Sequence, residues 1–287
     1  MNRPAQPADI PALIHEATVK IDHALDRYYT CPEGSPAELY EAMRFSLLAG
    51  GKRIRPFLTL EFCRAHNGDE AAAVPFACAI ESLHSYSLIH DDMPCLDGDV
   101  LRRGAPTNHV RFGEGTAMLA GDAMQAAAFG IAVGNDLVDS SAAIEAVRVL
   151  ASSAGPDGMV GGQMLDLIGE DRLLSLEELL RMNMLKTCRF ISAACELGCI
   201  AAGGDIAARR RAAEYGESIG LCYQLTDDLL DAETDKKEKT TFLSHYTESE
   251  AREYAVRLTR HAKELIKDDD KDGVLAALAE WLLTRKA

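Results

Sequence analysis

The stretch ESLHSYSLIHDDMPCLDGDVLRRG, residues 81–104, joins an apolar helical pattern to a run of carboxylates. No Gly or Pro interrupts residues 76–93, and apolar side chains recur at helical spacing up to the carboxylates, which predicts a helix that ends near Asp91. Pro94 should stop this helix within a turn. The chain then turns, and we expect Asp97 to return to the helix end.

Four carboxylates lie within nine residues of this stretch, and two arginines follow them. These residues are Asp91, Asp92, Asp97 and Asp99, then Arg102 and Arg103. Clustered carboxylates repel one another, and the C-terminus of a helix carries partial negative charge, so the cluster is costly unless a cation binds there. Taken alone, the cluster also fits a solvated acidic loop.

A second acidic cluster favours a bound cation over a solvated loop. The sequence QLTDDLLD, residues 224–231, again ends an apolar helical stretch. Asp227 and Asp231 are four residues apart and share one helix face, with Gln224 one turn earlier. Two such helix ends can face each other across one cavity, and their oxygen ligands suit Mg²⁺ shared with substrate phosphates.

Composition limits the class of protein and its partners. The chain has 287 residues, 47% of them hydrophobic, and a net charge of −15. This charge argues against nucleic acid or an anionic membrane as the main partner. Without about 18 uninterrupted apolar residues or a basic-then-apolar start, we expect a cytoplasmic protein with no stable membrane anchor. No change of composition marks a boundary, so residues 1–287 are expected to form one domain.

The periodicity predicts an all-α fold. No alternating pattern of a strand extends beyond a few residues. The expected helices include Pro11–Tyr29, Glu248–Lys267, Val274–Leu283 and one that runs from Ala37 through Leu48 to Gly50.

The segment GGKRIRP, residues 50–56, is expected to open a third helix. Its glycines, including Gly51, allow close approach of a ligand. Lys52 and Arg55 are three residues apart and would share a face, which suits a diphosphate. An ordinary helix start with solvated cations remains the alternative. His84 lies two turns before Asp91, although a single His is more often a core or surface residue.

The eight cysteines are scattered singly, as in a protein with reduced thiols. Cys195 and Cys199 are four residues apart, but no nearby pair of His or Cys completes a zinc site.

With these motifs, the chain resembles the trans-isoprenyl diphosphate synthases, in particular the bacterial group of farnesyl diphosphate synthase. The matching segments are 50–56, 81–109, 112–123, 161–167, 184–187 and 215–231. The resemblance implies an all-helical, isoprenoid synthase-type bundle around a deep central cavity, usually a homodimer. It also implies Mg²⁺-dependent, head-to-tail condensation of isopentenyl diphosphate with an allylic diphosphate, with three ions when substrate is bound.

The resemblance assigns roles by motif position. Metal binding would fall to Asp91, Asp97 and Asp227, supported by Asp92 and Asp231, with Asp228 as a further catalytic carboxylate. The isopentenyl diphosphate site would comprise Gly51, Lys52, Arg55, His84 and Arg103. The allylic diphosphate would contact Arg102, Lys186, Thr187 and Gln224. Gln163 and Asp166 match a polar pair that faces the same cavity.

Product length is assigned to the helix that carries Asp91. Growth of the prenyl chain away from the metal ions would meet Tyr86 and Ser87, one turn below. An aromatic residue there accompanies shorter products in this family, so we expect fifteen carbons. Alternatively, Tyr86 packs into the core with its hydroxyl bonded to a neighbouring helix.

Two departures from the family pattern stand out. The segment after Asp231 is about a dozen residues short; Lys239 resembles its later lysine, while Lys236 or Lys237 would have to replace the earlier one. Cys188 stands where the family usually has a glycine.

Several other readings remain open. A geranylgeranyl diphosphate synthase, a terpene cyclase, a metal-dependent phosphohydrolase and a non-catalytic subunit of a heteromeric synthase share parts of the pattern. The cyclase leaves GGKRIRP unexplained, and a non-catalytic subunit has no need of both Asp motifs. Asp268–Asp270 fits a solvated turn. Arg285 and Lys286 fit either a frayed terminus or a tail that folds over a phosphate.

Overall fold

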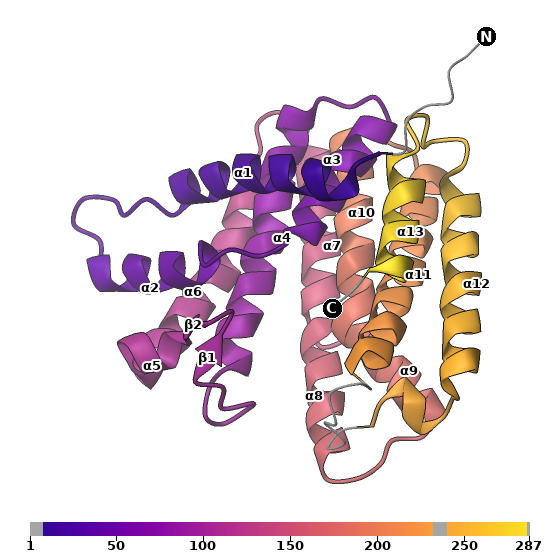
Figure 1. Cartoon of the computed structure of the whole chain (residues 1–287). Coiled ribbons are helices and arrows are strands. Elements are labelled where there is room, and N and C mark those ends of the chain that lie inside the picture. Colours follow the sequence, from indigo (N-terminus) through magenta and orange to yellow (C-terminus); the bar gives the residue numbers. More distant parts are fainter. Residues whose placement is uncertain (1–7, 232–239, 286–287) are drawn as a thin grey trace.

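The fold is built from helices that run mostly along one direction (Figure 1). The computed structural model describes residues 8–231 and 240–285. In chain order, the helical elements are α1 (Ile10–Tyr28), α2 (Ala37–Leu47), α3 (Ile54–Ala65), α4 (Glu70–Asp91), α5 (Asn108–Phe112), α6 (Glu114–Val133), α7 (Ser140–Ala154), α8 (Met159–Glu170), α9 (Leu176–Asn183), the π-helical turn η1 (Met184–Cys188), α10 (Arg189–Ala201), α11 (Ile206–Asp231), the 3₁₀ turn η3 (Phe242–Ser244), α12 (Glu248–Ile266) and α13 (Val274–Thr284). The all-α prediction is confirmed.

In the described residues, the strands are confined to one antiparallel hairpin after α4. Strands β1 (Leu101–Arg102) and β2 (Ala105–Pro106) are two residues each. The central residues Arg103 and Gly104 have φ of 54° and 79°. Two positive φ values in a two-residue loop are those of a type I′ turn, whose twist matches that of paired strands.

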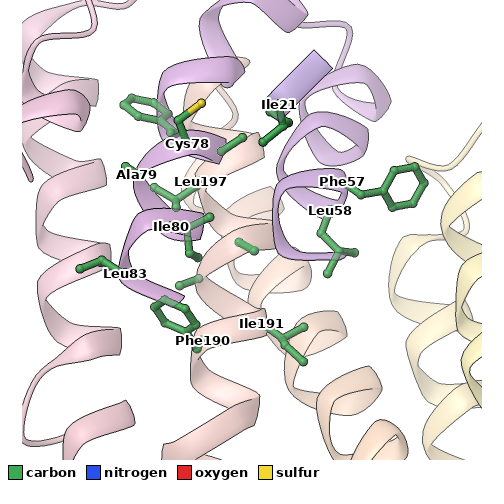
Figure 2. Packing of buried hydrophobic residues seen from close by; sticks show 14 of the residues in the cluster. Ile21, Phe57, Leu58, Cys78, Ala79, Ile80, Leu83, Phe190, Ile191 and Leu197 are labelled. Carbon is green, nitrogen blue, oxygen red and sulfur yellow. The ribbon is translucent and has the colours of Figure 1, made fainter. Parts of the chain in front are cut away.

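The core lies where α3, α4 and α10 meet (Figure 2). Ile80 and Leu83 of α4 and Leu197 of α10 are fully buried there. Gly198 lets α10 approach α3 closely, because a Cβ at this position would lie 2.3 Å from the carbonyl oxygen of Thr59. The three helices therefore hold the C-terminal end of α4 in a fixed place.

A second buried cluster supports the end of α11. Leu221 and Leu225 of α11 pack with Ala251 and Ala255 of α12 and with Phe242 of η3. The acidic C-terminal ends of α4 and α11 therefore each follow a helix body that is packed in an apolar cluster.

The third helix begins later than predicted. α3 starts at Ile54, because Gly50, Gly51 and Arg53 have φ of 85°, 142° and 45°, outside the right-handed helical region. Lys52 therefore lies in irregular backbone rather than on a helix face. The predictions of α1, α12 and α13 match within one residue at each end, whereas α2 ends at Leu47, before the predicted Gly50.

The predicted turn at Asp268–Asp270 is present and Asp268 is exposed, but the other two carboxylates are bonded within the fold. Asp269 pairs with Arg211 at 2.9 Å. Asp270 accepts hydrogen bonds from the backbone N–H groups of Leu275 and Ala276 at 3.1 and 2.8 Å. These carboxylates fix the start of α13, because the first N–H groups of a helix have no partner within it.

Helix α6 is apolar enough that its sequence fits either a core helix or a membrane-spanning helix. It is the one helix in the described residues that is long and apolar enough to cross a membrane, judged by length and composition. One such helix is weak evidence, since core helices pass the same test. Its inner face is buried, whereas Leu119 and Val133 are 60% and 58% exposed.

Candidate active site

The turn after α4 places two carboxylates side by side. The backbone N–H of Asp97 donates to the carbonyl oxygen of Asp91 at 2.9 Å, and Gly98 donates to Met93 at 3.1 Å. Gly98 has a φ of 66°, which glycine adopts without strain. The predicted return of Asp97 to the helix end is confirmed.

Asp91 and Asp92 face different surroundings. Asp91 lines a cavity, and burial, opposed by Lys186 and reinforced by Asp97, raises its pKa to about 6. The buried Asp92 instead accepts from Nε and Nη2 of Arg102 at 2.8 and 2.6 Å. Both members of this pair line a separate recess of about 30 Å³. Their metal and allylic roles stay predictions.

The type I′ turn separates the two arginines. Arg102 points to Asp92, whereas the Arg103 guanidinium contacts the carbonyl oxygen of Gly50. A Cβ on Gly51 would lie 2.8 Å from Nη1 of Arg103 and would displace the guanidinium, and the φ of 142° at this position also favours glycine. The two adjacent cations therefore serve different parts of the site.

The first of two adjoining cavities is mainly apolar and measures about 390 Å³. Asp91 and Lys186 stand among its apolar lining, and Lys186 pairs with Asp166 at 2.6 Å. Gln163, the other member of the predicted polar pair, also lines it. The apolar lining comes from α4, the turn after it and α8, and comprises Tyr86, Leu88, Leu96, Met159, Val160, Met164 and Leu167.

Tyr86 and Ser87 both line this cavity, one turn from Asp91. The Tyr86 ring packs edge-on against His90, with centroids 5.7 Å apart. Its hydroxyl is buried beside Gln125 of α6 and makes no hydrogen bond of regular geometry within the described chain. Ser87 donates to the carbonyl oxygen of His84 at 2.9 Å.

The second cavity is basic and measures about 420 Å³. Lys52, Arg55 and Arg103 line it, as predicted for one diphosphate site, together with Gln224, which was predicted for the other. Gln224 donates to Asn183 at 3.1 Å. The assignment of Gln224 to the allylic side stays a prediction.

Three residues line both cavities: Arg55, His84 and Thr187. Burial and the neighbouring guanidinium groups of Arg55 and Arg103 hold the pKa of His84 well below its usual value. The imidazole is therefore neutral near pH 7 and can donate one hydrogen bond without adding charge.

The C-terminal segment contacts the second acidic motif through Arg285. Arg285 pairs with Asp227 and stacks 3.8 Å from the ring centroid of Tyr223. The reading of Arg285 as frayed is therefore wrong, since its side chain is 6% exposed. Lys286 lies outside the described residues.

The other carboxylates of this motif diverge. Asp228 accepts from the backbone N–H of Phe242 at 2.6 Å, and burial raises its pKa to about 6. Asp231 is exposed at the end of α11. Lys239, with Lys236 and Lys237, lies outside the described residues, so its predicted contact stays a prediction.

The donor set fits Mg²⁺. Among the described residues, no three His, Cys, Asp or Glu side chains form a ready-made metal cluster. Asp91 and Asp97 at one helix end and Asp227 at the other offer carboxylate oxygens, the ligands that Mg²⁺ prefers. Because Mg²⁺ keeps waters and is commonly shared with substrate phosphates, separated carboxylates suffice.

Two features of the site were missed from the sequence. Arg53 and Glu81 form a buried ion pair at the basic cavity, 2.6 Å apart. Met159 and Met164 supply apolar wall from α8. The spacing of α8 gave a signal for the wall, whereas the left-handed φ of Arg53 has no pattern in sequence.

Comparison with known proteins agrees with this geometry. Residues 36–243 match the family model described as polyprenyl synthetase. The chain belongs to the polyprenyl synthetase family. It is thus a prenyltransferase, and the resemblance to the trans-isoprenyl diphosphate synthases is confirmed. The readings as a terpene cyclase or a phosphohydrolase are set aside.

Named relatives differ in product. A farnesyl diphosphate synthase of Geobacillus stearothermophilus is 42% identical over 78% of this chain and 76% of its own. The large subunit 1 of a heterodimeric geranylgeranyl pyrophosphate synthase of Arabidopsis thaliana is 39% identical over 93% of this chain and 76% of its own.

A solved structure shares the whole fold. The FPP/GFPP synthase from Zymomonas mobilis superposes with a TM-score of 0.91 and 36% identity, covering 97% of this chain and 100% of that one. The predicted fold class is confirmed at this level.

Proposed function

We propose that this synthase condenses isopentenyl diphosphate with dimethylallyl or geranyl diphosphate and releases farnesyl diphosphate, with Mg²⁺ as cofactor. The observation that carries the proposal is the pair of adjoining cavities, one apolar and one basic, that share Arg55, His84 and Thr187. Two diphosphate substrates whose carbon ends must meet need this arrangement.

In the basic cavity, Lys52, Arg55 and Arg103 bind the diphosphate of isopentenyl diphosphate. Three fixed cations neutralise a diphosphate in a partly enclosed site, where charge interactions are stronger than in water. His84, neutral and between the cavities, adds a hydrogen bond and no charge. The carbon end of the substrate is thereby directed toward the first cavity.

In the apolar cavity, Lys186 and Thr187 contact the allylic diphosphate, and the side chains of α4 and α8 exclude water from the allylic cation. To reach the diphosphate, Lys186 exchanges its pairing with Asp166 for the substrate. Asp91, Asp97 and Asp227 would hold Mg²⁺, as three ions once substrate is bound, and the metal would supply charge neutralisation for the leaving diphosphate. Asp92, Asp228 and Asp231 support these ligands.

A fifteen-carbon product follows from the wall formed by Tyr86 and Ser87. The growing chain runs down α4 from Asp91, and a buried aromatic ring blocks it one turn below. Tyr86→Ala is therefore expected to shift the product toward twenty carbons or more, measured by chromatography of the dephosphorylated products. Ser87→Ala, a small change at the same depth, serves as the control and should keep fifteen.

An unchanged product from a folded, active Tyr86→Ala variant would place the wall elsewhere. Geranylgeranyl diphosphate would then be the competing product, in line with the names of several relatives. The shape of α8, with its flexible methionines, would be the next wall to examine.

We propose further that the protein acts as a homodimer in the cytoplasm. The exposed apolar side chains of α6, Met118, Leu119 and Val133, favour a second copy of the chain as the covering partner. A heteromeric assembly is the second candidate, favoured by the Arabidopsis thaliana relative whose name describes a heterodimer.

A further inference from the structure

The basic cavity contains one carboxylate among its described lining residues. Glu81 of α4 lines it, and its side chain is 4% exposed. Burial lowers the pKa of Arg55 and of Arg103, and the charge of Glu81 opposes this shift in both guanidinium groups. A buried carboxylate that interacts with two ligand-binding cations competes with any anion that they bind.

Arg53 holds this carboxylate. Its Nη1 donates to Oε1 of Glu81 at 2.6 Å, and its Nε donates to Oδ1 of Asp22 at 2.8 Å. Its Nη2 donates to the carbonyl oxygen of Leu47. Its side chain is 1% exposed, and each of its three nitrogens is hydrogen-bonded within the protein.

The backbone at Arg53 is itself unusual. Its φ of 45° lies in the left-handed region, which costs free energy for a residue with a Cβ. This conformation ends the loop of Gly50–Lys52 and begins α3, so that Lys52, Arg53 and Arg55 all line the cavity, with the Arg53 side chain buried against Glu81. The buried ion pair of Arg53 with Glu81 offsets part of the free energy that the left-handed backbone conformation costs.

We propose that Arg53 is a positioning residue, which binds Glu81 and so keeps that carboxylate from pairing with Arg55 and Arg103. The two arginines, with Lys52, then remain available for the diphosphate of isopentenyl diphosphate. This inference rests on the proposed function of the basic cavity. It assigns to Arg53 a specific task in substrate affinity, beyond holding the loop.

The test compares Arg53→Met with the double variant Arg53→Met/Glu81→Gln. The single variant leaves Glu81 charged beside Arg55, and should raise the KM and the Kd for isopentenyl diphosphate about tenfold or more. The KM for geranyl diphosphate should stay within about twofold. The double variant removes the competing charge and should bring the isopentenyl diphosphate constants back to within about threefold of wild type.

A purely structural role gives a different result. If Arg53 only holds the loop, the double variant stays as impaired as the single one, which would overturn the proposal. Should Arg53→Met fail to fold, Glu81→Gln alone decides. A Kd for isopentenyl diphosphate equal to or lower than that of wild type supports the proposal, and a raised Kd contradicts it.

Two controls separate this inference from the proposed function. Arg64→Met removes an arginine of α3 that, like Arg53, binds two carboxylates, here Glu61 and Glu70, outside both cavities, and should leave the Kd unchanged. Lys52→Ala should weaken binding. If Lys52→Ala binds as wild type does, the cavity is not the isopentenyl diphosphate site, and both claims fail. If it weakens binding while the double variant shows no recovery, only the role of Arg53 fails.

Discussion

Adjacent residues of this site have separate tasks, because the backbone turns between them. Asp91 faces a cavity, whereas Asp92 is buried against Arg102. Arg102 and Arg103 diverge in the same way at the type I′ turn. Charge placement at the level of single residues is therefore set by where α4 ends and by two positive φ values.

Burial also controls the charge of residues outside the site. Glu61 of α3 is 5% exposed, and burial raises its pKa from 4.5 to about 6, opposed by Arg64. Its contribution to stability is fully present below pH 4.5 and is lost as the pH rises through 6. Glu61→Gln should therefore raise the free energy of unfolding at pH 7.5 by about 1–2 kcal/mol, with no gain at pH 4.

The measurement is urea unfolding of both proteins at the two pH values. Glu178→Gln is the control with the opposite sign. Hydrogen bonds from Arg172 and Ser175 lower the pKa of that exposed carboxyl to about 2, so this substitution should not stabilise the protein at pH 7.5. A Glu61→Gln protein that is less stable than wild type at pH 7.5 would show that the pairing with Arg64 outweighs burial.

At the level of elements, the contact between α4 and α6 fixes the end of the acidic helix. His90 lies against α6, with Nε2 at 3.1 Å from the carbonyl oxygen of Met118. A Cβ on Gly121 would lie 2.1 Å from this nitrogen. Gly121→Ala should thus destabilise the fold by about 1–3 kcal/mol and lower turnover, because Asp91 adjoins His90.

Thermal unfolding and a steady-state assay measure the two effects. Gly130→Ala is the matched control on the same helix, since nothing lies within 4 Å of an added Cβ. Alanine favours the helix there by about 0.5–1 kcal/mol. Equal stability of the two variants would mean that α4 and α6 can separate without cost.

The ends of a helix could be predicted where hydrophobic periodicity alone sets them. They could not be predicted where an unusual backbone conformation sets them. The periodicity of α1, α12 and α13 gave their ends within one residue, and that of α2 gave its start. The start of α3 was missed, because Arg53 adopts a left-handed conformation that residue type does not indicate. Spacing likewise predicted that Asp91 and Gln224 line the site, where they lie in adjoining cavities. It did not predict the pairings of Asp92 or Asp227, which depend on distant arginines.

For the whole molecule, the uncovered face of α6 predicts the oligomeric state. Leu119→Glu places a charge on a 60% exposed apolar position and should convert the dimer to a monomer, because an interface tolerates a buried unpaired charge poorly. Light scattering after size exclusion should fall from twice 31.1 kDa to 31.1 kDa. Val19→Glu, at a 59% exposed position of α1, should not change the mass. A wild-type mass of 31.1 kDa would contradict the homodimer.

The central claim is that the two cavities join isopentenyl diphosphate to an allylic diphosphate and stop at fifteen carbons. The most direct test incubates the protein with Mg²⁺, isopentenyl diphosphate and, in separate reactions, dimethylallyl or geranyl diphosphate, followed by chromatography of the products. We predict farnesyl diphosphate from both starters, and a loss of turnover on the order of 10²–10³ in Asp91→Ala. The absence of any prenyl product from either starter with the folded wild-type protein would contradict the account.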